Sequence, residues 1–135
     1  MRFLDTNILL YSVSGKRGEE EKRSIAAELL ARGDCAVSVQ VLQEFYVQAT
    51  RATRADALSH ETAVAFMETW MRFPVQEMTL AILTHALALK RRRRFSYWDC
   101  AIVAAAYASG CDTLYSEDLS HGQAIEGVRI VNPFR

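Results

Sequence analysis

The chain has 135 residues, of which 50% are hydrophobic and 24% are charged. This composition is typical of a globular protein and excludes a disordered chain. The length predicts one domain over residues 1–135, large enough to bury about two-thirds of the surface of its unfolded chain. Lys plus Arg equals Asp plus Glu at 16 each, so the net charge does not indicate any class of partner.

The cysteines Cys35, Cys100 and Cys111 are odd in number and have no C-x-x-C spacing. This pattern indicates neither a disulfide framework nor a zinc site, and it predicts small core residues in a reducing compartment. No apolar stretch approaches the ~20 residues that cross a bilayer, and Asp5 comes too early for a signal peptide. We therefore expect a cytoplasmic protein without a membrane partner.

Short apolar runs bounded by turn residues predict strands, and apolar residues three or four positions apart predict helices. In chain order, the expected elements are a strand at residues 3–4, a helix at 8–11, a turn at 14–18, a helix at 19–32, a strand at 35–38, a helix at 39–50, a loop at 51–59, a helix at 60–73, an edge strand at 75–78, helices at 79–91 and 96–109, and strands at 113–116 and 128–131. Ser38, Thr79 and Ser96 suit helix N-caps, whereas Gly33 and Gly110 suit helix ends. Strands that alternate with helices predict βαβ units with right-handed crossovers. The fold class expected is α/β, a three-layer α/β/α domain around a central parallel sheet of about five strands.

Two carboxylates follow predicted strands, at the edge where open parallel sheets bind their ligands. Asp5 comes directly after the first strand, and Asp118 comes after the fourth. Asp5 has a simpler interpretation as a turn or helix-cap residue, and Asp118 as part of a surface turn. Either Asp118 or its neighbour Glu117 can be the acid that follows this strand at the ligand edge.

Two further acids lie on predicted helices. Glu44 lies beside the apolar face of the helix at 39–50, although most helical Glu residues are only solvated. Asp99 completes an S-x-x-D capping box with Ser96, and it opens a helix that is apolar on every side. A carboxylate near an apolar interior is costly unless it is paired, hydrogen-bonded or bound to metal. Capping and metal binding are compatible for Asp99.

In a parallel α/β fold these four positions converge, because strand ends and helix starts meet at one edge of the sheet. Carboxylates crowded there without a counter-ion repel one another, which raises one or more pKa values. Hard oxygen ligands suit Mg²⁺ or Mn²⁺. Such ions activate a water molecule and stabilise the charge that develops on a phosphodiester. A metal-dependent hydrolase needing neither a His nor a Ser nucleophile is therefore predicted.

Five motifs in this order span the chain: FLDTNIL (3–9), VSVQVLQEF (37–45), FSYWDCAIVAA (95–105), YSEDLSHG (115–122) and VNPF (131–134). Together they resemble PIN-domain proteins of the VapC type, the ribonuclease toxins of bacterial and archaeal toxin–antitoxin (VapBC) systems. The resemblance implies Mg²⁺- or Mn²⁺-dependent endoribonuclease activity, a homodimer, and a VapB-like antitoxin with a segment that fills the active-site groove. It also implies the catalytic and metal-binding acids Asp5, Glu44, Asp99 and Asp118, with Thr6, Asn7 and Ser116 as supporting polar residues.

The basic run before Asp99 has two interpretations. Arg91, Arg92, Arg93 and Arg94 can form a solvated helix end, where cations are favourable, or contact the RNA backbone. Trp98 can stack an RNA base beside the metal site. For His121 a surface turn is favoured over a metal ligand.

Other enzyme classes fit less well. A haloacid-dehalogenase-like phosphatase requires a second Asp two residues after Asp5, where this chain has Asn7. A receiver domain requires a late Lys, and the C-terminal third contains none. We predict an endoribonuclease in which a metal-activated water held by the four acids cleaves RNA to leave 5′-phosphate and 3′-hydroxyl ends. The family resemblance implies transfer RNA or other structured RNA as the substrate. The alternative is a catalytically silent PIN-like module that binds RNA or antitoxin.

Overall fold

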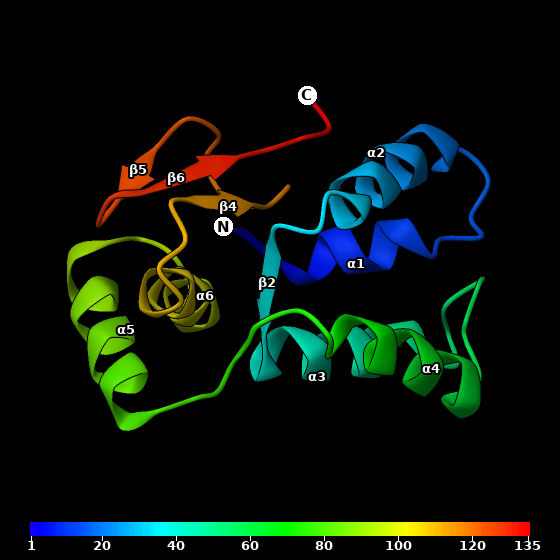
Figure 1. Ribbon diagram of the computed structural model, residues 1–135, viewed down its shortest axis with the longest axis horizontal. Helices are drawn as coiled ribbons and strands as arrows, with labels where there is room; N and C mark the ends of the chain where they lie inside the picture. Colours follow the sequence, from blue (N-terminus) through cyan, green and yellow to red (C-terminus); the bar gives the residue numbers. More distant parts are fainter.

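The computed structural model describes residues 1–135, and a six-stranded sheet lies at its centre (Figure 1). The strands are β1 (Arg2–Leu4), β2 (Cys35–Ser38), β3 (Val75–Gln76), β4 (Thr113–Tyr115), β5 (Ala124–Ile125) and β6 (Val128–Val131). Their order in the sheet is β3-β2-β1-β4-β6-β5. Five strands are parallel, as expected from the sequence, and only β5 pairs antiparallel, with β6.

Six helices accompany the sheet: α1 (Thr6–Ser12), α2 (Glu20–Ala31), α3 (Val39–Ala49), α4 (His60–Trp70), α5 (Leu80–Arg92) and α6 (Tyr97–Ala108). The predicted N-caps are confirmed, since Ser38, Thr79 and Ser96 each accept a hydrogen bond from a backbone N–H three residues later. Figure 1 shows α5 beside α6 and α2 beside α1. None of the six helices is long and apolar enough to cross a membrane.

Four elements differ from expectation by two residues or more, and one of them is β3, which ends at Gln76 instead of residue 78. The first helix begins at Thr6, two residues early, because Asp5 caps it. Helix α4 ends at Trp70 although Pro74 had been expected to end it, and residues 71–73 form a turn. The two-residue strand β5 was not predicted, because two residues carry no readable periodicity.

The core is built around β1 and α6. Phe3 and Leu4 are fully buried in β1, and every residue from Cys100 to Ala106 is buried in α6. This burial confirms the prediction from the all-round apolar character of α6. The three cysteines are buried free thiols, consistent with small core residues.

The register of the sheet brings distant residues to one edge. Leu4 of β1 lies opposite Tyr115 of β4, so Asp5 and Ser116 leave the sheet side by side. The Asp5 backbone N–H donates to the Tyr115 carbonyl at 3.0 Å. Helix α3 begins directly after β2 and therefore starts at this same carboxyl-terminal edge.

Candidate active site

One pocket at this edge collects all four acids predicted from the sequence, and we call it the acidic pocket. It is lined by Asp5, Thr6, Asn7, Leu10, Glu44, Gln48, Trp98, Asp99, Ile102 and Asp118. The carboxylates come from the N-cap of α1, from α3, from the first turn of α6 and from the loop after β4. No Lys, Arg or His lines the acidic pocket, so its ionisable groups are all acids.

Asp5 lies deepest, with only 6% of its surface exposed. Its Oδ1 accepts the Thr6 backbone N–H at 2.7 Å, and its Oδ2 accepts the Ser116 hydroxyl at 2.7 Å. Burial, with smaller contributions from the charges of Glu44 and Asp118, outweighs the lowering effect of these two hydrogen bonds and raises the pKa of Asp5 to about 6. A buried carboxylate in this environment is unfavourable when ionised unless a cation joins it.

Glu44 is oriented by two neutral partners. Its Oε2 accepts the Thr6 hydroxyl at 2.9 Å, and its Oε1 accepts the Gln40 amide at 2.8 Å. The Gln40 amide also donates to the Trp98 carbonyl at 3.4 Å, which connects α3 to the first turn of α6. Thr6 thus connects Asp5 to Glu44, and Gln40 connects Glu44 to the segment that carries Asp99.

Asp99 belongs to the helix cap, as predicted, and it also lies in the acidic pocket. Its backbone N–H donates to the Ser96 hydroxyl at 3.1 Å, so it belongs to the helix cap. Its side chain also lines the acidic pocket. Burial raises the pKa of Asp99, and the like charges of Asp118 and Glu44 raise it further.

Asp118 lies at the open side of the acidic pocket. Its Oδ2 accepts the Asn7 amide at 3.2 Å, and its backbone N–H donates to the Ser116 hydroxyl oxygen at 3.2 Å. The three polar residues predicted to support the acids therefore all contact them: Thr6 contacts Asp5 and Glu44, Ser116 contacts Asp5 and Asp118, and Asn7 contacts Asp118.

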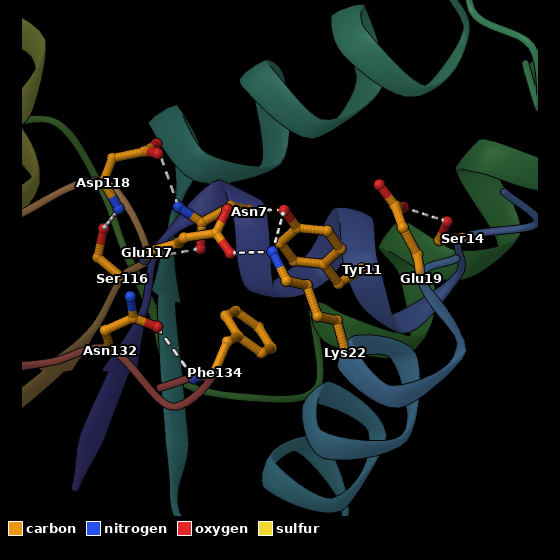
Figure 2. A network of polar contacts seen from close by, with 10 residues as sticks. All are labelled: Asn7, Tyr11, Ser14, Glu19, Lys22, Ser116, Glu117, Asp118, Asn132 and Phe134. Carbon is orange, nitrogen blue, oxygen red and sulfur yellow. Dashed lines mark hydrogen bonds and ion pairs between the residues drawn. The ribbon is translucent and has the colours of Figure 1, made fainter. Parts of the chain in front are cut away.

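Glu117 and His121 do not line the acidic pocket. The Glu117 carboxylate instead pairs with Tyr11 and Lys22, as Figure 2 shows. The Nδ1 of His121 accepts the Asn132 backbone N–H at 3.0 Å, which gives His121 a structural contact. Of the two adjacent acids, only Asp118 faces the acidic pocket.

Of the residues predicted to contact RNA, Trp98 lies at the acidic pocket and the four arginines do not. Trp98 lines the acidic pocket, is 61% exposed, and also lines an adjoining groove with Gln40 and Gln43. The arginines at 91–94 do not line the acidic pocket, and Arg92 pairs with Glu126 at 2.9 Å.

Several residues of this region were not identified from the sequence. In the sequence, Gln40 and Gln48 look like ordinary helical residues. They lie beside acids only because α3 begins at the edge of the sheet where the acids meet. Lys16 and Arg54 line a second groove that shares Asp118 with the acidic pocket. Both lie in turn-rich segments without a motif, so no local signal identifies them.

The chemistry of the lining fits a divalent cation. As the side chains are placed, no three His, Cys, Asp or Glu side chains lie close enough to hold one ion together. The hydrogen-bond partners of Glu44 and Asp118 are uncharged side chains, so neither carboxylate is neutralised by a cation of the protein. Four hard oxygen donors, two of them with raised pKa values, match the preferences of Mg²⁺ and Mn²⁺.

Comparisons with known proteins agree with this architecture. Residues 2–124 match the profile of the PIN domain family. A toxin–antitoxin complex from Klebsiella pneumoniae contains a chain of similar fold, with a TM-score of 0.72, 21% identity and 98% coverage of both chains. VapC20 of Mycobacterium tuberculosis, described as a Sarcin-Ricin loop cleaving toxin, has a TM-score of 0.67 and 22% identity over 87% of this chain and 90% of its own. VapBC2 from Rickettsia felis, bound to a promoter DNA fragment, has a TM-score of 0.64 and 18% identity over 96% of each chain. No curated protein matches by sequence.

Proposed function

Because the chain belongs to the PIN domain family, we propose that it is a Mg²⁺- or Mn²⁺-dependent endoribonuclease that acts as the toxin of a toxin–antitoxin pair. The observation that carries this proposal is the acidic pocket, where four carboxylates from four separate segments meet without a basic side chain. The similarity in fold to a chain of a toxin–antitoxin complex and to an RNA-cleaving toxin supports it.

In this proposal Asp5, Glu44, Asp99 and Asp118 hold the ion. When bound there, an ion would activate a water molecule and would stabilise the negative charge that develops on the scissile phosphodiester. The chain's own contribution is to keep the four acids in place, through Thr6, Asn7, Ser116 and Gln40, before the ion arrives. Such neighbours of metal ligands orient them and tune their affinity. The products are RNA ends with a 5′-phosphate and a 3′-hydroxyl.

The surface around the acidic pocket supports an RNA substrate. Trp98 offers an exposed aromatic face at the rim, on which an unpaired base can stack. The Lys16 side chain lines the groove on the Asp118 side, where a backbone phosphate would lie beyond the cleaved bond. Arg91, Arg92, Arg93 and Arg94 form a more distant basic segment for the same backbone.

The protein partners proposed are a VapB-like antitoxin and a second copy of the chain. An antitoxin segment that blocks the site would place a basic side chain in the acidic pocket, because its lining has no cation of its own. Leu80, Leu83 and Leu87 form an exposed apolar stripe on α5, with 81%, 37% and 54% of their surfaces exposed. An apolar stripe of this kind supports a homodimer contact.

The test is cleavage of total RNA and transfer RNA by purified protein free of antitoxin, with Mg²⁺, with Mn²⁺ and with EDTA. Asp5→Ala should abolish discrete, metal-dependent cuts. Asp112→Asn is the matched control, because this exposed Asp lies just before the opposite end of β4 and should change nothing. A folded protein that binds Mn²⁺ but cuts no RNA would refute the nuclease and favour the silent binding module. Absence of Mn²⁺ binding would refute the metal site itself.

A further inference from the structure

Glu117 and Asp118 are adjacent in sequence but face different surroundings. Asp118 lines the acidic pocket, whereas both oxygens of the Glu117 carboxylate are already bound elsewhere. The Tyr11 hydroxyl donates to Oε1 at 2.6 Å, and the Lys22 ammonium lies 2.5 Å from Oε2 (Figure 2). Each oxygen of the Glu117 carboxylate therefore has a partner outside the acidic pocket, and Glu117 lies in the adjoining groove that Lys16 also lines.

Lys22 is itself held by aromatic rings. Its ammonium lies 4.8 Å from the centre of the Tyr11 ring and 5.6 Å from that of Phe134, within the range of cation–π attraction. The two rings pack edge to face at 4.9 Å. We call the set Tyr11, Lys22, Glu117 and Phe134 the Glu117 clamp. It joins α1, α2, the loop after β4 and the C-terminal segment.

The Glu117 clamp is connected to the acidic pocket through one side chain. The backbone N–H of Glu117 donates to the Asn7 Oδ1 at 3.3 Å, and the Asn7 Nδ2 donates to the Asp118 carboxylate at 3.2 Å. A movement of the Glu117 backbone would therefore reach Asp118 both through the peptide bond between them and through Asn7.

We propose that Lys22 and Tyr11 are positioning residues that hold Glu117 out of the acidic pocket, so that Asp118 is the acid of this pair that faces the metal. The inference rests on the proposed function. A released Glu117 would be drawn toward a divalent ion bound beside its neighbour Asp118, because an unpaired carboxylate is attracted to such an ion. Glu117 would then displace Asp118 or add a fifth carboxylate to a site already crowded with like charge.

The test compares four proteins for Mn²⁺ affinity, measured by electron paramagnetic resonance, and for kcat and KM on RNA. Lys22→Met removes the ammonium and keeps the stem, and Lys22→Arg keeps the charge. Asp34→Asn is the control, because the Arg2–Asp34 pair is about as exposed as the Lys22–Glu117 pair and joins residues at the opposite edge of the sheet. Lys22→Met should weaken Mn²⁺ binding about tenfold and lower kcat with KM unchanged. Lys22→Arg and Asp34→Asn should resemble the wild type.

A double variant isolates the cause. If a released Glu117 disturbs the site, Lys22→Met with Glu117→Gln should recover most of the lost Mn²⁺ affinity. Wild-type affinity in Lys22→Met, or no recovery in the double variant, would overturn the inference. If Lys22→Met does not fold, Tyr11→Phe tests the same contact. We expect it to lose less Mn²⁺ affinity than Lys22→Met, and wild-type affinity in Tyr11→Phe would overturn the inference. The wild type and Lys22→Met could bind Mn²⁺ equally well and cut RNA equally well. That result would refute the role of the Glu117 clamp alone, and the proposed function would stand.

Discussion

The raised pKa of Asp5 predicts that the metal-free protein is less stable at neutral pH because of its own active-site carboxylate. Burial, with smaller contributions from Glu44 and Asp118, raises the pKa of Asp5 from 3.8 to about 6. The native state therefore binds this proton more tightly than the unfolded chain does. Its contribution to the free energy of unfolding falls as the pH rises from about 4 to about 6, and it stays low above that range.

The size of the effect follows from the two pKa values. A difference of about two pKa units corresponds to roughly 3 kcal/mol, because one unit is worth about 1.4 kcal/mol. The Asn side chain in Asp5→Asn does not ionise, so this variant does not lose that free energy of unfolding as the pH rises. It also weakens the hydrogen bonds that Asp5 accepts from Thr6 and Ser116, but that cost is nearly independent of pH. The free energy of unfolding of Asp5→Asn minus that of the wild type should therefore rise by about 2 kcal/mol from pH 4 to pH 7, because Asp5 of the unfolded chain, with a pKa of 3.8, is already partly ionised at pH 4.

Urea unfolding in EDTA at pH 4, 5, 6 and 7 measures this difference directly. Titrating groups that do not interact with Asp5, such as Glu117 with its lowered pKa, contribute equally to both proteins and cancel. At pH 7, Mn²⁺ at a hundred times its dissociation constant should stabilise the wild type by about 2.7 kcal/mol and Asp5→Asn by much less. A difference that stays flat from pH 4 to pH 7 would show that Asp5 has an ordinary pKa, and the electrostatic argument for a cation would fail.

Three further predictions concern the surface and the core. Trp98→Ala should weaken RNA binding at least fivefold, because one base stacked on an aromatic ring is worth about 1–3 kcal/mol. In a Trp70→Phe background and in EDTA, RNA that stacks on Trp98 should quench its fluorescence. The absence of quenching would contradict the stacking. Replacing Arg91 and Arg94 with Gln should flatten the slope of log affinity against log salt concentration by about 0.7 per lost phosphate contact, as measured by salt titration. An unchanged slope would show that neither residue contacts an RNA phosphate. Phe45→Ala should lower the free energy of unfolding by about 3–5 kcal/mol in urea and leave the Mn²⁺ affinity of the folded protein unchanged, since Phe45 is fully buried against Trp70.

The sequence was sufficient to predict the parts of the fold that depend on local pattern. Short apolar runs and helix caps such as Ser38 and Ser96 act within a few residues, so they can be recognised without neighbours in space. The convergence of Asp5 and Asp118 follows from the parallel sheet, which brings strand ends to one edge. That these acids share the acidic pocket is therefore a consequence of topology, and topology could be inferred from the alternation of strands and helices.

Other features depend on contacts that no local pattern encodes. The identity of the acid that faces the acidic pocket is decided by Lys22 and Tyr11, which lie about a hundred residues before Glu117. Gln40 orients Glu44 only because α3 begins at the sheet edge. Strand β5 was missed because its residues pair only once the turn at Glu126, with φ of 53°, has formed.

The central place of β1 also bears on the timing of activity during synthesis. β1 is made first, yet one of its two neighbours is β4, with Arg2 opposite Thr113, and Asp118 follows later still. Until β4 is made, β1 has an open edge, and the site lacks both Ser116 and Asp118. Closing contacts across such long sequence separations is slow compared with forming local ones. For a chain proposed to cut RNA, this order means that the growing polypeptide stays inactive until β4 and the loop that carries Asp118 have been made.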